Sequence, residues 1–83
     1  MSKQETYLLN LMKANPARTL SFMDIAHKVM RAKKVTEYSQ IDMAGLALTV
    51  ASLTEKGLIY TEMKTLRNFH GDTEQQPVWF WVG

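Results

Sequence analysis

The chain begins with apolar residues at helical spacing behind a polar start signal. The recurring apolar residues are Tyr7, Leu8, Leu11 and Met12. Ser2 and Glu5 stand three residues apart, as in a capping box, where each side chain bonds the backbone of the other residue. The pattern predicts a helix from Lys3 to Ala14. Pro16 should end it, because a residue that precedes proline avoids the helical conformation.

A short extended segment and a second capped helix should follow. Residues 18–20 predict a first strand. Ser21 and Asp24 repeat the capping-box spacing, so this helix should begin at Phe22. Its expected buried side chains are Ile25, Ala26 and Val29. The apolar pattern fades into a basic segment, residues 31–34.

The longest predicted helix covers residues 37–56, and its apolar side chains extend over about two-thirds of its circumference. Such a helix should be buried on several sides, with Ile41, Leu48 and Leu53 in the core. The remaining positions form what we call the polar stripe: Tyr38, Asp42, Gly45, Thr49, Ser52 and Lys56. We expect this stripe to face outward, toward solvent, a nucleic-acid groove or a protein partner. Gly57 should cap the end of the helix.

The last third of the chain predicts two strands joined by a polar loop. Residues 58–66 alternate as a strand with Ile59 buried, residues 67–76 form turns, and Pro77 should open the final strand. In that strand one face carries Val78, Phe80 and Val82, and the other carries Trp79 and Trp81. Because a three-stranded sheet usually buries one face, one of these apolar faces needs a further cover.

This order of elements resembles a winged helix-turn-helix domain. The resemblance covers residues 3–82, and it is carried by LSFMDIAHKV and by IDMAGLALTVASLTEKGLIY. The LTEKGLI ending is similar to a junction common in bacterial winged-helix regulators. The resemblance implies one α+β domain over residues 1–83, in the order helix, strand, helix, helix, strand, strand. It also implies that the long helix contacts bases and that residues 67–76 form the wing loop.

Composition narrows the class of protein. The chain has 83 residues and no cysteine, which predicts one domain stabilised by packing, without disulfides. It has no apolar run long enough for a membrane span and no secretory signal, so we expect a cytoplasmic protein. The formal net charge of +2 is unevenly distributed. Residues 13–34 carry six basic residues against one acid, whereas residues 35–83 carry three against six.

Candidate catalytic or metal chemistry is sparse. His27 and His70 stand on different predicted elements, and a metal site needs three or four converging ligands. The sequence has no nucleophile elbow, phosphate-binding loop or dinucleotide fingerprint. We therefore expect neither an enzyme nor a bound metal or cofactor.

The first functional hypothesis is a small DNA-binding transcriptional regulator of a bacterium or mobile element. Candidate phosphate contacts are Arg31, Lys33, Lys34, Lys64 and Arg67. Candidate base contacts are Ser39, Gln40 and Thr49. A contiguous positive surface over the long helix and the hairpin would favour this hypothesis.

The alternative is a protein-interaction module that does not bind DNA, either a homodimer or an adaptor or inhibitor with another partner. Tyr60, Trp79 and Trp81 are its candidate interface residues, because tyrosine and tryptophan are favoured interface anchors. The two tryptophans could equally be part of the core under the first helix. A neutral groove beside an apolar patch would favour this alternative.

Overall fold

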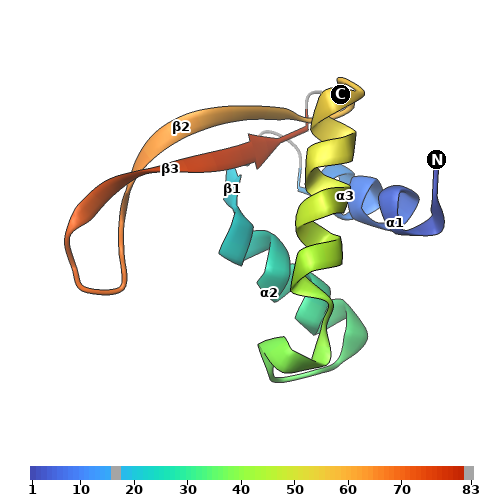
Figure 1. The fold of residues 1–83 in the computed structure, drawn as a ribbon, viewed down its shortest axis with the longest axis horizontal. Helices are drawn as coiled ribbons and strands as arrows, with labels where there is room; N and C mark the ends of the chain where they lie inside the picture. Colours follow the sequence, from blue (N-terminus) through green and yellow to red (C-terminus); the bar gives the residue numbers. More distant parts are fainter. Residues whose placement is uncertain (16–17, 82–83) are drawn as a thin grey trace.

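A computed structural model, which describes residues 1–15 and 18–81, shows a small α+β fold (Figure 1). Its elements are α1 (Lys3–Lys13), β1 (Leu20–Ser21), α2 (Phe22–Lys33), a 3-10 turn (Tyr38–Gln40), α3 (Met43–Glu55), β2 (Tyr60–Arg67) and β3 (Thr73–Phe80). The described strands form an antiparallel sheet in the order β1-β3-β2. The helices gather at one end of this sheet, and the β2–β3 hairpin extends away from them (Figure 1).

Both predicted capping boxes are confirmed. The Ser2 hydroxyl accepts the Glu5 N–H at 3.1 Å, and the Glu5 carboxylate accepts the Ser2 N–H at 3.2 Å. Ser21 and Asp24 make the same exchange at 3.1 and 3.0 Å. These local bonds satisfy N–H groups that the first turn of a helix leaves free. The predicted end of α1 agrees within one residue, while Pro16 lies outside the described residues.

The predicted start of the long helix is wrong. Ile41 is extended, with φ −124° and ψ 155°, and Asp42 is the residue that caps α3 by accepting the Gly45 N–H at 2.9 Å. Before this break, the Gln40 side chain accepts the N–H groups of Thr36 and Glu37 at 3.1 and 3.0 Å. Side chains that bond nearby backbone groups compete with the helix, so the apolar pattern alone did not locate its start.

The end of α3 is as predicted, with Gly57 in the left-handed conformation at φ 74°. The Gly57 N–H bonds the Thr54 carbonyl at 3.0 Å, and the Leu58 N–H bonds the Leu53 carbonyl at 3.1 Å. This pair of bonds is a Schellman motif, which ends a helix and turns the chain. It directs the chain into β2.

The second strand of the hairpin begins earlier than predicted, and the loop is shorter. β2 and β3 pair from Tyr60 opposite Phe80 to Arg67 opposite Thr73, so the loop is residues 68–72. Pro77 lies inside β3 rather than at its start. β1 pairs only with residues 78 and 79 of β3, so β3 has a free edge at Pro77, where a missing N–H is tolerated. The predicted strand residue Val82 lies outside the described residues.

The short loop has a local cause. The Asn68 side-chain oxygen accepts the N–H groups of His70 and Asp72, at 3.0 and 3.1 Å. Gly71 takes φ 88°, a conformation that glycine adopts without strain. These features close the hairpin in five residues, where the polar composition suggested ten.

The core lies where α1, α3 and the base of the sheet meet. Its buried members are Leu8, Leu9, Met12, Leu20, Ile25, Val50, Leu53 and Ile59. The predicted burial of Ile25, Val29, Leu53 and Ile59 is confirmed. Ile41 is only half-buried, and the prediction for Leu48 is wrong, because that side chain is 72% exposed.

Candidate interaction surfaces

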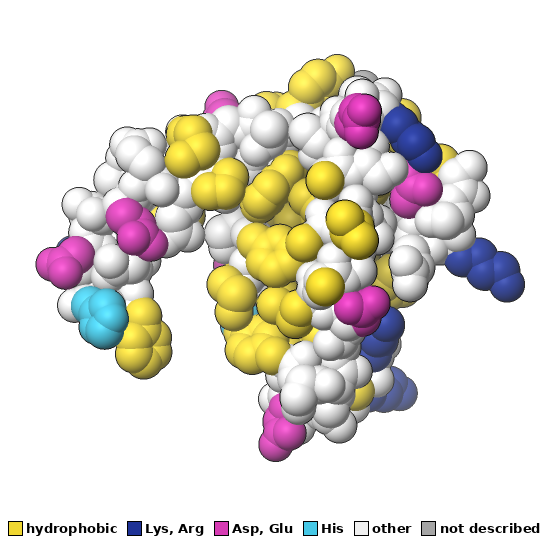
Figure 2. Space-filling model, viewed as in Figure 1, with side chains coloured by type: hydrophobic (Ala, Val, Ile, Leu, Met, Phe, Trp, Pro, Cys, Tyr) yellow, Lys and Arg dark blue, Asp and Glu magenta, His cyan; other side chains and the backbone are white. Residues whose placement is uncertain are grey.

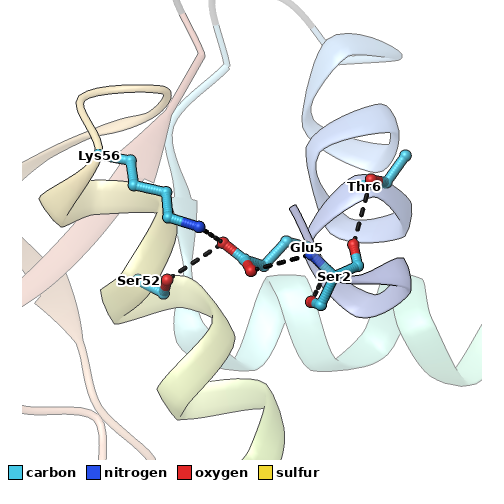
Figure 3. Close-up of polar contacts among 5 residues, drawn as sticks. All are labelled: Ser2, Glu5, Thr6, Ser52 and Lys56. Atoms are coloured by element: carbon cyan, nitrogen blue, oxygen red, sulfur yellow. Dashed lines mark hydrogen bonds and ion pairs between the residues drawn. The ribbon is translucent and has the colours of Figure 1, made fainter.

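Glu5 links α1 to α3. Its carboxylate accepts the Ser52 hydroxyl at 3.1 Å and pairs with the Lys56 ammonium at 2.6 Å, while still capping its own helix (Figure 3). Lys56, helped by the Ser2 backbone N–H and the Ser52 and Ser2 hydroxyls, lowers the pKa of Glu5 from 4.5 to about 2. Ser52 and Lys56 both belong to the polar stripe. This stripe therefore faces α1 instead of facing outward.

Two further members of the polar stripe have structural roles. Thr49 is 8% exposed, and its hydroxyl donates to the Gly45 carbonyl at 2.8 Å. A Cβ atom at Gly45 would overlap the Asp42 carboxylate that caps the helix. The small residue at position 45 is explained by this cap. Thr49 was predicted to contact bases, and the structure corrects this: its side chain is buried, and its hydroxyl is already bonded to the Gly45 carbonyl.

The opposite side of α3 is exposed and apolar. We call it the apolar stripe: Ala44, Ala47, Leu48 and Ala51. These positions follow the i, i+3, i+4, i+7 spacing of one helix face. All four are exposed, and the first charged side chain along this line is Glu55. Sequence reasoning missed the stripe because apolar residues also occupy the buried side of α3.

Figure 2 shows the surface around this stripe, where hydrophobic side chains gather in the hollow between the hairpin and α3. The Lys and Arg side chains seen in this view lie at its margins, and acidic side chains border the hydrophobic area. Large hydrophobic side chains are also exposed on α2 and the hairpin: Met23, Tyr60, Met63 and Phe69. The face between the helix and the hairpin is thus apolar rather than basic.

The predicted aromatic interface is divided between two faces of the sheet. Trp79 and Trp81 are half-buried against the core, and the Trp79 ring stands edge-on to Phe22 at 6.4 Å. Tyr60 is half exposed and stacks on Phe80, its cross-strand partner, at 5.9 Å. Because side chains alternate along a strand, Phe80 and Tyr60 lie on the face opposite the tryptophans. The three aromatic residues do not form one surface.

The remaining candidate DNA contacts are spread over three elements. Arg31 and Lys33 are exposed near the end of α2, which Lys34 terminates. Ser39 and Gln40 belong to the 3-10 turn, and Arg67 ends β2 beside the hairpin loop. The Lys64 ammonium donates to the Thr19 hydroxyl at 3.2 Å, and Thr19 and Arg31 both line one cleft beside α2.

A second hollow, of about 400 Å³, lies between α1, α2 and the start of α3. Its walls are mainly apolar and include Tyr7, Val29 and Leu46. The charged side chains Lys3, Lys33 and Asp42 border it, and the last of these is engaged in the helix cap. Its groups suggest no reaction chemistry.

His27 is exposed, as expected, and its Nε2 lies 2.7 Å from the Tyr38 hydroxyl. Within residues 1–15 and 18–81, no three histidine or acidic side chains gather as a metal site would require. In the same part of the chain, no helix is both long and apolar enough to cross a membrane.

Comparisons of the chain with protein-family models, curated proteins and solved structures find no match.

Proposed function

We propose that the chain is a winged helix-turn-helix domain that acts as a protein-interaction module. In this proposal α3 occupies the place of the recognition helix, and the β2–β3 hairpin is the wing. The observation that carries it is the exposed apolar stripe on α3. A helix that reads the major groove needs polar or cationic groups for the base edges, whereas this stripe offers mainly methyl groups.

The chemistry of the stripe suits another helix. Three alanines flank Leu48, so a partner backbone can approach closely while the leucine fills a hole in the opposing surface. Moving one exposed leucine out of water contributes about 1.5–3 kcal/mol. The neighbouring hollow between the hairpin and α3 extends the apolar area (Figure 2). We favour a second copy of this chain as the partner, because two such stripes are complementary across a two-fold axis.

This proposal replaces the DNA-binding regulator as the preferred hypothesis for the α3 face. Of the candidate base contacts, Thr49 is buried and Gln40 already accepts two backbone N–H groups. The face also lacks the contiguous basic surface that phosphate attraction requires (Figure 2). We propose no enzymatic activity for it.

Sedimentation equilibrium of the purified chain at increasing concentration tests the proposal. We expect reversible dimers for the wild type and monomers for Leu48→Lys, which places a charge within the stripe. The matched control is Asn10→Lys, which adds the same charge at an exposed position of α1, outside the apolar stripe and the hairpin. A wild-type chain that stays monomeric at every concentration would contradict the dimer, as would equal dimerisation of all three proteins.

A further inference from the structure

The outward side of α2 has a chemistry different from that of α3. Asp24, His27, Lys28 and Arg31 follow the same i, i+3, i+4, i+7 spacing. The opposite side of α2 is buried through Ile25, Ala26, Val29 and Met30. The outward residues, together with residues 18–20, line a cleft of about 390 Å³. We call this the α2 cleft.

The α2 cleft carries an excess of positive charge. Arg18, Lys28 and Arg31 line it against one acid, Asp24, whose carboxylate already accepts the Ser21 N–H at 3.0 Å. Lys64 is not a lining residue, but its ammonium donates to the hydroxyl of Thr19, which lines the cleft.

Within residues 1–15 and 18–81, none of these cations forms an ion pair. Lys28 donates to the side-chain oxygen of Asn15 at 3.1 Å, and Lys64 donates to a hydroxyl, so neutral acceptors hold both ammonium groups. In the part of the chain that the structure describes, the one ion pair joins Glu5 to Lys56. Three cations line the cleft beside a single carboxylate that is already bonded, and like charges that share one cleft repel each other. A bound anion would relieve that repulsion.

We propose that the α2 cleft binds phosphate groups. Arginine presents a planar fork of N–H donors that matches phosphate oxygens, and Arg18 and Arg31 supply two such forks. Lys28 and Lys64, positioned by Asn15 and Thr19, add point charges. The phosphate can come from a free ion or from a nucleic-acid backbone. This site shares no residue with the apolar stripe, so it can fail while the proposed function stands.

The test uses two probes on the whole chain: inorganic pyrophosphate, followed by backbone amide NMR shifts, and a short DNA duplex, followed by fluorescence anisotropy at two salt concentrations. The cleft variant is Lys28→Gln with Arg31→Gln. The matched control is Lys3→Gln with Lys13→Gln, which removes the same charge from exposed positions of another helix, α1, that do not line the cleft.

We expect the wild type to bind and the cleft variant to bind at least about tenfold more weakly, because each lost charge-assisted bond contributes more than a neutral one. The control should change by about twofold or less, since a more distant charge is screened. Pyrophosphate shifts centred on residues 18–31 would support a site for free phosphate. Binding of the duplex alone, with a strong salt dependence, would support the nucleic-acid backbone as the source.

Two results would overturn the inference. One is the absence of binding to both probes at low salt. The other is equal weakening in the two double variants, which would reduce the effect to net charge. If the cleft variant loses its helical circular dichroism, Arg18→Gln replaces it, because Arg18 precedes β1 and is exposed. Arg18→Gln should also weaken binding, and wild-type affinity in that variant would equally count against the cleft.

Discussion

Helices α2 and α3 each have an outward face with the spacing i, i+3, i+4, i+7, but this face is charged on α2 and apolar on α3. On α2 the exposed stripe carries His27, Lys28 and Arg31, and the buried side is apolar. On α3 the exposed stripe is apolar, and polar residues such as Ser52 face another helix. α2 is an ordinary amphipathic helix, whereas α3 is apolar on both its buried and its exposed sides.

Polar residues of α3 therefore do not all face solvent: Ser52 and Lys56 bond Glu5 on the neighbouring helix. Glu5, fixed on α1 by its own capping box, offers acceptor oxygens to Ser52 and Lys56 (Figure 3). These bonds act together with the burial of Val50 and Leu53 to favour one rotation of α3 about its axis. Ala44, Ala47, Leu48 and Ala51 are then left outside the core.

The largest expected effect separates the two sides of α3. Leu53→Ala should cost about 2–5 kcal/mol of unfolding free energy, because Leu53 is fully buried and its loss leaves a cavity. Leu48→Ala should change stability by no more than about 0.5 kcal/mol, because that side chain is exposed. Urea denaturation of the two variants at low protein concentration measures both. Equal losses would mean that α3 is rotated differently.

The second prediction tests the contribution of Glu5 to that rotation. Its pKa is lowered from 4.5 to about 2 in the folded chain, so the stabilisation is complete above pH 4.5 and is lost as the pH falls toward 2. Wild-type stability should therefore fall across that range. Glu5→Gln should be less stable at neutral pH and should lose less on acidification. Parallel pH profiles of the melting temperature would show that Glu5 does not couple the helices.

The third prediction concerns the start of α3. Gly45→Ala should change the unfolding free energy by less than about 0.5 kcal/mol, because loss of the Asp42 cap, about 1 kcal/mol, is offset by the stronger helix preference of alanine. Asp42→Ala should cost about 1 kcal/mol, because it removes the cap without that compensation. The double variant should cost no more than Asp42→Ala alone, since the overlap is then gone. Thermal denaturation of the three variants measures the coupling between positions 42 and 45. If the effects of the two single substitutions simply add in the double variant, the two positions are not coupled.

The smallest effect is expected at the end of α2. Lys34 has φ 58° and ψ 39°, a left-handed conformation that costs a residue with a side chain about 1 kcal/mol. Lys34→Gly should relieve that strain and raise the unfolding free energy. Lys33→Gly is the control, because Lys33 is helical and glycine should weaken it. The urea midpoint should rise for Lys34→Gly and fall for Lys33→Gly. A lower midpoint in both variants would show that the backbone at Lys34 is not strained.

The sequence predicted what local contacts determine. The capping boxes, the body of α2 and the glycine after α3 involve residues within a few positions of one another. The orientation of α3 also involves the bonds of Glu5 with Ser52 and Lys56, which lie far from it in the sequence. The spacing of apolar residues cannot indicate contacts of this kind. An apolar pattern that covers most of a helix could not indicate which side would be buried.

The sequence showed that basic residues are concentrated within residues 13–34, but it did not show which of them share one cleft. Arg31 and Lys64 were predicted as phosphate contacts; Arg31 lines the α2 cleft, and Lys64 bonds Thr19, another of its lining residues. Lys28 and Arg18 were missed as site residues, although the spacing of residues 24, 27, 28 and 31 was a readable signal. Arg18 joins them through the path of the chain into β1, which depends on tertiary structure.

The hairpin has a consequence for how the molecule opens. β1 pairs with β3 only at residues 78 and 79, while β2 and β3 continue to pair as far as residues 67 and 73 (Figure 1). A two-stranded ribbon is marginally stable by itself in water. Amide hydrogens near Tyr60 and Phe80 should therefore exchange only with global unfolding, whereas those near Arg67 and Thr73 should exchange through local opening. The strand pair would then open from its loop toward its base while the helices stay folded.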